Sequence, residues 1–312
     1  MKKSVLSKFS VKKATKPTSL SVLIPVYNYD CSDLVHSLHE HARNENLNVN
    51  IMLGNDCSSE SFQTLYKNLE EKQLCTVISS PKNIGAGAMR NMLIDNANNE
   101  ILLLMDSDTM PLDKDFLQRY VAYYEKNVVV CGGLKYVDNK PAKEYMLRYK
   151  YGVNVEAKNA ATRNKHPYRN FIGMCFMSSK DVLSKVRFDA EMGMGYEDAY
   201  FGFLLKKNNV PIVHIDNPVV HQLKETSVEF LATTKRYIDN LYAHHNKMSE
   251  TVKLLKTYNK IKHSLIGRSL HVINKYFAQH IERQLVSKNP SLKLFSLYKL
   301  LYLDKKFNTE NK

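Results

Sequence analysis

The chain has 312 residues, of which 44% are hydrophobic, and its formal net charge is +14. This is enough for one large or two modest domains with a buried core. No apolar stretch approaches the roughly 18–20 residues that cross a bilayer, and the basic N-terminus lacks the apolar segment of a signal peptide. Five irregularly spaced cysteines show no CxxC pair and no zinc spacing. We therefore expect a cytoplasmic protein with reduced thiols.

The charge is unevenly distributed along the chain. Residues 1–17 contain six lysines and no acidic residue, and residues 223–312 contain 17 Lys and Arg against 7 Asp and Glu. The segment 18–222 therefore has a net charge of only −2. This pattern predicts a catalytic body between two basic ends, which suit an anionic lipid surface or a nucleic acid.

The first third of the chain alternates between apolar runs and segments of helical periodicity. Strands are predicted at 19–28, 48–56, 75–80 and 100–108, with helices at 32–45, 61–71 and 83–97. Strands and helices that alternate at this spacing form a parallel, doubly wound sheet through right-handed crossovers. The sequence therefore predicts an α/β fold.

The later elements are less regular. Helices are predicted at 113–126 and 198–208, and strands at 127–134, 171–178 and 210–216, whereas 135–169 is a polar stretch rich in Tyr and Lys. From residue 223 the pattern becomes helical, with segments at 227–245, 249–265, 267–287 and 291–303. We predict a basic N-terminal arm (1–17), a catalytic domain (18–222) and a basic helical C-terminal region (223–312).

Two carboxylates end the fourth apolar run. Asp106-Ser107-Asp108 follows the residues 101–105, Ile-Leu-Leu-Leu-Met. Ligands bind at the C-terminal edge of strands in open α/β sheets, and alternate residues there can direct two carboxylates at one divalent cation. The alternative is an acidic turn that caps the next helix.

A second acidic pair, Glu197-Asp198, follows Gly193 and Gly195 at the start of a predicted helix. Adjacent residues there point in different directions, so one could hold an acceptor hydroxyl while the other removes its proton. Carboxylates are also favoured at a helix N-terminus without any catalytic role.

A lone histidine, His221, follows a late apolar segment. It is either a structural residue or a metal ligand, and His214 is the competing candidate.

The segment 83–91, Asn-Ile-Gly-Ala-Gly-Ala-Met-Arg-Asn, is rich in glycine. Gly85 and Gly87 would allow a ligand to approach the backbone closely, and Arg90 could neutralise phosphate. The spacing matches neither the dinucleotide fingerprint nor the P-loop. The alternative is a helix start whose small residues pack on the sheet.

Taken in order, these motifs resemble those of family 2 glycosyltransferases of the GT-A fold, over roughly residues 19–225. SVLIPVYN looks like the family's opening strand, GNDCSSE like V-D-D-G-S-T-D, and NIGAGAMRN like N-x-G-x-x-x-A-R-N, while LLLMDSD carries D-x-D. GMGYEDAYFG followed by VVHQ is similar to the G-x-E-D region and metal-binding histidine of galactosyltransferase-like members.

The resemblance implies a role for each matching residue. Asp56 would contact the nucleotide base, Asp198 would be the catalytic base, and Glu197 and Tyr196 would bind the acceptor. The metal, Mn²⁺ or Mg²⁺, would be held by Asp108, His221 and Asp106. The residues implied for nucleotide-sugar binding are Pro25, Tyr27, Asp30, Asp56, Asn83, Gly85, Arg90, Asp106 and Ser107.

The chain departs from the family pattern at several positions. Asn55 and Cys57 replace an aspartate and a glycine of the second motif, and Met89 replaces the alanine before Arg90. The tryptophan common before G-x-E-D is missing because the chain has none. Met192, Met194 or Tyr196 would then provide the surface on which the acceptor packs.

The resemblance implies an inverting, metal-dependent glycosyltransferase that uses a nucleoside-diphosphate sugar, with a UDP-sugar favoured. The transferred group would be a hexosyl or N-acetylhexosaminyl unit, and the acceptor a glycan or lipid-linked glycan of polysaccharide biosynthesis. The tail 223–312 could hold the enzyme at the inner face of the cell membrane, or it could simply pack on the catalytic domain.

Two alternatives remain at this stage. A nucleotidyltransferase usually has a Gly-rich basic loop after the first strand, and here that loop is VYNYDCSD. A basic binding protein with an inactive GT-A-like domain would explain the charge. It would not explain the near-neutral segment 18–222, and we expect no nucleic acid partner.

Overall fold

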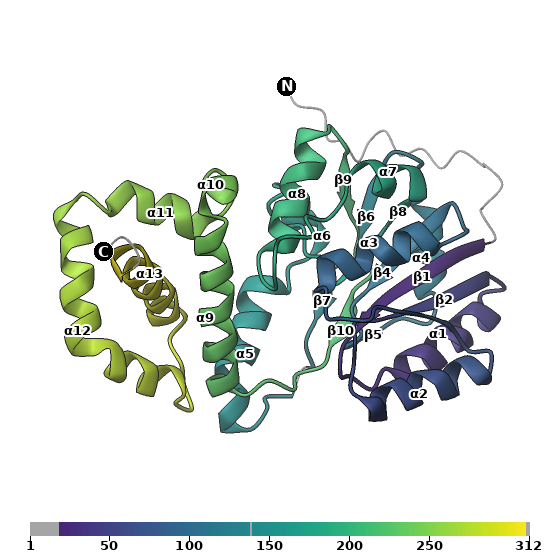
Figure 1. Ribbon diagram of the computed structural model, residues 1–312, viewed down its shortest axis with the longest axis horizontal. Coiled ribbons are helices and arrows are strands. Elements are labelled where there is room, and N and C mark those ends of the chain that lie inside the picture. The colour runs from purple at the N-terminus through teal and green to yellow at the C-terminus, as the bar shows by residue number, and fades with distance from the viewer. Residues whose placement is uncertain (1–18, 138, 310–312) are drawn as a thin grey trace.

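The computed structural model describes residues 19–137 and 139–309 (Figure 1). The predicted basic arm at 1–17 lies outside the described residues. The described chain contains a seven-stranded sheet with the strand order β3-β2-β1-β4-β8-β6-β9. Its strands are β1 Ser19–Val26, β2 Asn48–Asn55, β3 Thr76–Ser79, β4 Ile101–Met105, β6 Val129–Cys131, β8 Cys175–Ser179 and β9 Ile212–His214.

The sheet is mainly parallel, as predicted. β1 runs parallel to β2 and β4, β2 to β3, and β6 to β9. β8 is the exception, since it runs antiparallel to both β4 and β6. The strand predicted at 171–178 therefore begins later, at Cys175, and has the opposite direction. The parallel strands β1, β2 and β4 end at one edge of the sheet. Asp56 follows β2 there, and Asp106-Ser107-Asp108 follows β4.

Helices cover both faces of this sheet. Because successive residues of a strand point to opposite faces, Ile24 packs with α1 and α2, and Leu23 packs with α3 and α8. Burial on both faces explains why these strands are continuously apolar. The helices around the sheet are α1 Ser32–Asn44, α2 Glu60–Glu71, α3 Ala86–Asn96, α4 Phe116–Ala122, α7 Lys180–Lys185 and α8 Glu197–Lys207.

A small second sheet was not predicted. Its order is β5-β10-β7, with β5 at Thr109–Pro111, β10 at Val219–His221 and β7 at Leu134–Lys135. β5 continues directly from the D-x-D turn and pairs antiparallel with β10, so that Thr109 lies opposite His221. The strand predicted at 127–134 is accordingly divided between β6 and β7.

The polar stretch at 135–169 is largely helical. It contains the 3-10 turn η2 Lys143–Tyr145, α5 Met146–Tyr151, the π-helical turn η3 Gly152–Glu156 and α6 Ala160–Asn164. This segment lies between the sheet and the C-terminal helices (Figure 1).

The C-terminal region is helical, as predicted. It consists of α9 Ser227–Ala243, the short α10 His245–Met248, α11 Lys253–Ile261, α12 Leu265–Leu285 and α13 Leu292–Thr309. α13 lies inside a ring formed by α9, α11 and α12 (Figure 1). Leu147 of α5 joins the apolar cluster of these helices, so the region packs on the rest of the chain. Within the described ranges, no helix has both the length and the apolarity to span a bilayer.

Candidate active site

A cleft of about 1680 Å³ opens where β1, β2 and β4 end, and it extends to α9 and α13. Nearly all the residues implied by the motifs line it. They are Pro25, Tyr27, Asp56, Asn83, Gly85, Arg90, Asp106, Ser107, Asp108, Tyr196, Glu197, Asp198 and His221. Asp30 is not among the lining residues. It is exposed, and its carboxylate accepts a hydrogen bond from the backbone N–H of Ser32 at 2.9 Å.

Asp56 joins the end of β2 to the glycine-rich loop before α3. One carboxylate oxygen accepts from the backbone N–H of Ile84 at 2.7 Å, and the other from that of Gly85 at 2.9 Å. Gly85 has φ +83°, a conformation that glycine adopts without strain. Asp56 therefore shapes this end of the cleft, and its contact with a nucleotide base stays a prediction.

Arg90 links the two acidic motifs. Its guanidinium is buried, and Nη2 donates to Asp106 Oδ1 at 2.6 Å, while Nη1 lies 3.6 Å from Glu197 Oε1. The guanidinium carbon also lies over the ring of Phe188, 5.2 Å from the ring centroid. α3 therefore carries a cation between carboxylates that would otherwise repel each other.

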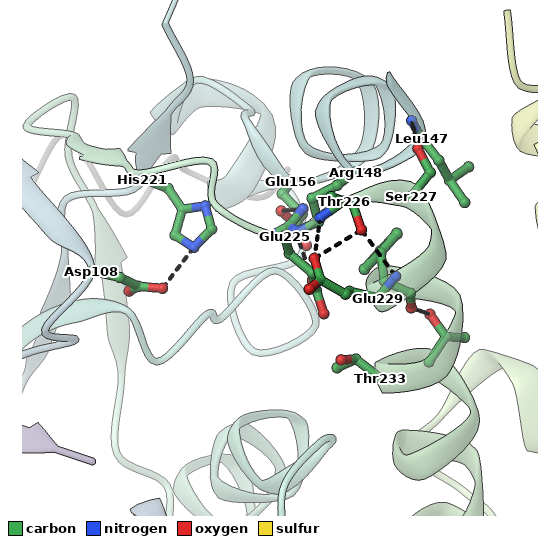
Figure 2. Close-up of polar contacts among 12 residues, drawn as sticks. Asp108, Leu147, Arg148, Glu156, His221, Glu225, Thr226, Ser227, Glu229 and Thr233 are labelled. Atoms are coloured by element: carbon green, nitrogen blue, oxygen red, sulfur yellow. Dashed lines mark hydrogen bonds and ion pairs between the residues drawn. The ribbon is translucent and has the colours of Figure 1, made fainter. Parts of the chain in front are cut away.

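Asp108 contacts the histidine that the sequence singled out. His221 Nε2 lies 3.0 Å from Asp108 Oδ2 (Figure 2), because the pairing of β5 with β10 places His221 beside the D-x-D turn. Although burial acts to raise the pKa of Asp108, its hydrogen bond and charge interaction with His221 lower that pKa below the ordinary value. The imidazole is buried.

This pair fits a divalent cation. Carboxylate and imidazole are both ligands of Mn²⁺, and sites that act on phosphates often use one or two side chains plus the phosphates themselves. Asp106, the third predicted ligand, bonds to Arg90 instead. Among the described residues, no group of three or more His, Cys, Asp or Glu side chains is arranged to hold a metal. The ligands this geometry favours are thus Asp108 and His221.

His214, the competing histidine, has structural partners. Its ring is buried, with Nδ1 2.9 Å from Arg163 Nη1 and Nε2 3.0 Å from the carbonyl oxygen of Pro167. It is not one of the residues that line the cleft.

Residues from the polar stretch 135–169 support His221, although no motif in the sequence pointed to them. The ring of Tyr136 meets that of His221 edge-on, with 5.4 Å between the ring centroids. The guanidinium carbon of Arg148 lies over the ring of Tyr136, 5.4 Å from its centroid. Glu156 accepts from the Tyr136 hydroxyl and from Arg148, the latter at 3.0 Å. Arg148 also lies 3.9 Å from Glu225 (Figure 2). Residues 135–169 show no helical or strand periodicity from which these contacts could be predicted.

The start of α8 is held in an unusual conformation. Gly195 and Tyr196 both have positive φ, +94° and +67°, and Glu197 Oε2 accepts from the backbone N–H of Gly195 at 2.9 Å. From α9, Asn240 Nδ2 donates to the carbonyl oxygens of Gly195 at 2.7 Å and Gly193 at 3.1 Å. The turn that presents the second acidic pair is therefore fixed by the C-terminal region.

The pKa of Asp198 is raised towards neutral pH. Burial, and then the charge of Glu197, raise the pKa of Asp198 to about 7. Hydrogen bonds to its carboxylate act in the opposite direction, including one from the backbone N–H of Ala199 at 2.6 Å. A general base works best when its pKa lies near the operating pH.

The C-terminal region completes the cleft. α9 begins directly after the His221 segment, with a capping box in which Thr226 Oγ1 accepts from the Glu229 N–H at 3.3 Å and Glu229 accepts from the Thr226 N–H at 2.8 Å (Figure 2). Tyr237 of α9 and Lys299 of α13 line the cleft. The site therefore extends beyond the predicted catalytic domain, 18–222.

We expect Gly195→Ala to lower the free energy of unfolding by about 1–3 kcal/mol. An added Cβ would lie 2.4 Å from the Tyr237 ring, and alanine is strained at this φ. Gly193→Ala is the matched control, since its Cβ would lie 3.4 Å from Asn240 Oδ1. Urea unfolding of both variants checks the prediction, and equal stabilities would contradict it.

Comparison with known proteins shows the family to which the chain belongs. Residues 21–187 match the family described as Glycosyl transferase family 2. That match spans more than half of the chain, and the protein belongs to this family. It is therefore a glycosyltransferase rather than a nucleotidyltransferase. No curated protein sequence matches the chain significantly.

Solved structures share the fold. S. aureus TarS 1-349 is similar with a TM-score of 0.50 at 16% identity, over 94% of this chain and 92% of that chain. TarS 1-349 in complex with UDP-GlcNAc gives a TM-score of 0.50 at 15% identity, over the same shares. The mannosyltransferase PcManGT from Pyrobaculum calidifontis, in complex with GDP-Man and Mn²⁺, gives 0.57 at 12% identity, over 93% and 86%. These likenesses confirm the GT-A-like fold.

Proposed function

We propose that this glycosyltransferase is inverting and metal dependent, and that it transfers a hexosyl or N-acetylhexosaminyl group from a nucleoside-diphosphate sugar, with UDP-sugars favoured. One observation carries the proposal: Asp198, a partly buried carboxylate whose pKa is raised to about 7, shares a cleft with the Asp108–His221 pair. The TarS and PcManGT complexes hold UDP-GlcNAc and GDP-Man, which supports a nucleotide-sugar donor here.

In the proposed reaction Asp198 removes the proton from an acceptor hydroxyl. The hydroxyl oxygen forms a bond to the anomeric carbon from the face opposite the diphosphate, and the bond to the diphosphate breaks. The nucleoside diphosphate leaves with the bonding electron pair. Asp108 and His221 would hold the cation, which when bound stabilises negative charge on the departing diphosphate. Attack from the opposite face inverts the anomeric centre without a covalent intermediate.

The acceptor side of the cleft follows from the same turn. Glu197 would hold the acceptor sugar, and Tyr196, fixed between Gly195 and α8, would provide the platform that tryptophan supplies elsewhere in the family. We propose a glycan or lipid-linked glycan of polysaccharide biosynthesis as the acceptor. A lipid-linked acceptor would be met at a membrane surface.

Nucleotide release from a panel of UDP-, GDP- and dTDP-sugars tests the proposal. We expect slow turnover of one donor in the presence of Mn²⁺ and its loss with EDTA. Calorimetry should show that Mn²⁺ strengthens binding of the matching nucleoside diphosphate. We expect His221→Ala to reduce that strengthening at least tenfold, a change of the order seen when metal-site partners are removed. His36→Ala, an exposed residue of α1, is the control.

The same experiment can also reject the proposed activity. If no donor is turned over and Mn²⁺ does not change nucleotide binding, the strand-end carboxylates are structural. The GT-A-like domain would then be inactive.

A further inference from the structure

One stretch of the C-terminal region has a charge of a single sign. Residues 251–281 contain six Lys and Arg and three His, and no Asp or Glu at all. Four of the cations are exposed around the junction of α11 and α12 and along α12, namely Lys260, Lys262, Arg268 and Lys275. This stretch therefore attracts anions and contains no acidic residue of its own.

The same stretch exposes apolar side chains. Of the thirteen large hydrophobic residues that are exposed in the described chain, five lie on α12. They are Leu265 at 81% exposure, Ile266 at 63%, Val272 at 52%, Tyr276 at 63% and Phe277 at 56%. α12 forms the outer edge of the helical region, on the side away from the sheet (Figure 1).

The packing of α12 explains why these side chains face outward. Leu270, Ile281 and Leu285 occupy the apolar core beneath the helix. At about 3.6 residues per turn, Leu265, Val272 and Tyr276 lie on the opposite side of the helix. Ile266 and Phe277 lie beside the core-facing residues but are exposed as well. At the N-terminus, Ser264 caps the helix by accepting from the Gly267 N–H at 3.3 Å. A Cβ on Gly267 would lie 2.3 Å from the Ile261 carbonyl oxygen. This tight corner with α11 leaves Leu265 and Ile266 at the surface.

We propose that this outer face of α12 seats the protein on an anionic lipid bilayer. By the α12 outer face we mean the exposed residues Leu265, Ile266, Arg268, Val272, Lys275, Tyr276 and Phe277 of α12, together with Lys260 and Lys262 at its junction with α11. Its apolar side chains enter the boundary between headgroups and acyl chains, and its cations contact the lipid phosphates. The helix lies in the plane of the membrane and does not cross it. The proposal does not depend on sugar transfer.

Charge and apolarity together select the bilayer over other occupants. A second copy packed on this face would oppose four cations to four cations, with no acidic residue in residues 251–281 of either copy, which is unfavourable. A nucleic acid would neutralise the cations, but its phosphates would offer no apolar surface to cover the side chains of Leu265 and Ile266. A bilayer interface accepts both kinds of side chain at once.

Vesicle flotation of the full-length protein tests the proposal. We expect binding to phosphatidylcholine vesicles that contain phosphatidylglycerol, and weak binding to phosphatidylcholine alone. Leu265→Gln with Ile266→Gln should weaken binding at least tenfold, because both apolar side chains leave water when they enter the bilayer. Lys260→Gln, Lys262→Gln and Arg268→Gln together should weaken it by about fivefold per charge at low salt.

Matched controls remove similar groups from other surfaces. Tyr123→Gln with Val228→Gln replaces two exposed apolar residues. Lys67→Gln, Lys126→Gln and Lys185→Gln together remove three exposed cations of the catalytic body. Both controls should bind vesicles as the wild type does, and every variant should keep its nucleotide-sugar turnover in lipid-free buffer.

Three results would overturn the proposal. One is equal vesicle binding by the α12 variants and their controls. Another is a loss of dimer mass in light scattering for Leu265→Gln with Ile266→Gln while vesicle binding persists. The third is tight binding of a single-stranded oligonucleotide that the same variants abolish while vesicles are not bound at all.

Discussion

Replacing Asp198 by asparagine is expected to lower kcat for sugar transfer by about 10²–10⁴-fold, the contribution typical of a general base. Asparagine keeps the shape of the side chain but cannot take the proton of the acceptor hydroxyl. Binding of the nucleoside diphosphate with Mn²⁺ should be unchanged, because Asp108 and His221 are left intact. Asp95→Asn is the control, since that carboxylate pairs with Arg187 on the surface.

The pH dependence of kcat separates this base from a merely structural carboxylate. With the pKa of Asp198 raised to about 7, kcat should fall about tenfold per pH unit below that value, because protonation removes the base. Glu197→Gln takes away a neighbouring negative charge that helps to raise this pKa. The inflection should therefore move to lower pH, while KM for the acceptor rises.

Two outcomes would contradict the assignment of Asp198. The first is an Asp198→Asn enzyme that retains kcat within a few-fold of wild type. The second is an inflection that stays in place or moves to higher pH in Glu197→Gln.

The central sheet was predictable because its information is local. β1 and β4 are buried on both faces, so that neighbouring residues such as Leu23 and Ile24 must both be apolar. A run of this kind is visible without knowledge of its partners. β5 and β10 have only three residues each, too few for a period, and their pairing joins Thr109 to His221 across the chain. The residues next to Thr109 and next to His221 in the sequence do not indicate that contact.

The same distinction between local and long-range information applies to the candidate site. The acidic motifs could be placed at strand and helix ends from their neighbours alone. The partners of each carboxylate could not, because Asp106 meets Arg90 and Asp108 meets His221 only after β4, α3 and β10 have assembled. The change of composition at residue 223 indicated a separate helical region. It gave no sign that Tyr237 would pack beside Gly195 and form a wall of the cleft.

Replacing Arg90 by methionine is expected to lower the free energy of unfolding by about 3–5 kcal/mol, the usual cost of breaking a buried ion pair from one side. The guanidinium is buried and lies 2.6 Å from Asp106 and 3.6 Å from Glu197, and the charge of Asp198 also acts on it. Methionine would fill much of the volume but leave these carboxylates without a counter-charge. Urea unfolding at neutral pH measures the loss.

Arg187→Met is the matched control. Arg187 makes two hydrogen bonds of 2.7 Å to Asp95, but that pair is largely solvent-exposed, and its loss should cost no more than about 1 kcal/mol. Equal losses in the two variants would show that Arg90 does not neutralise the cluster.

The pH dependence of the Arg90→Met protein gives a second criterion. Carboxylates left partly buried without a cation have a pKa above the unfolded value, so their protonation favours the folded state. The stability deficit of Arg90→Met should therefore shrink as the pH falls from 8 towards about 5. Asp106→Asn in the same background should recover part of the stability at neutral pH, since it removes one carboxylate charge that has lost its counter-charge. A deficit that is independent of pH would mean that Arg90 acts through its packing against Phe188 and not through its charge.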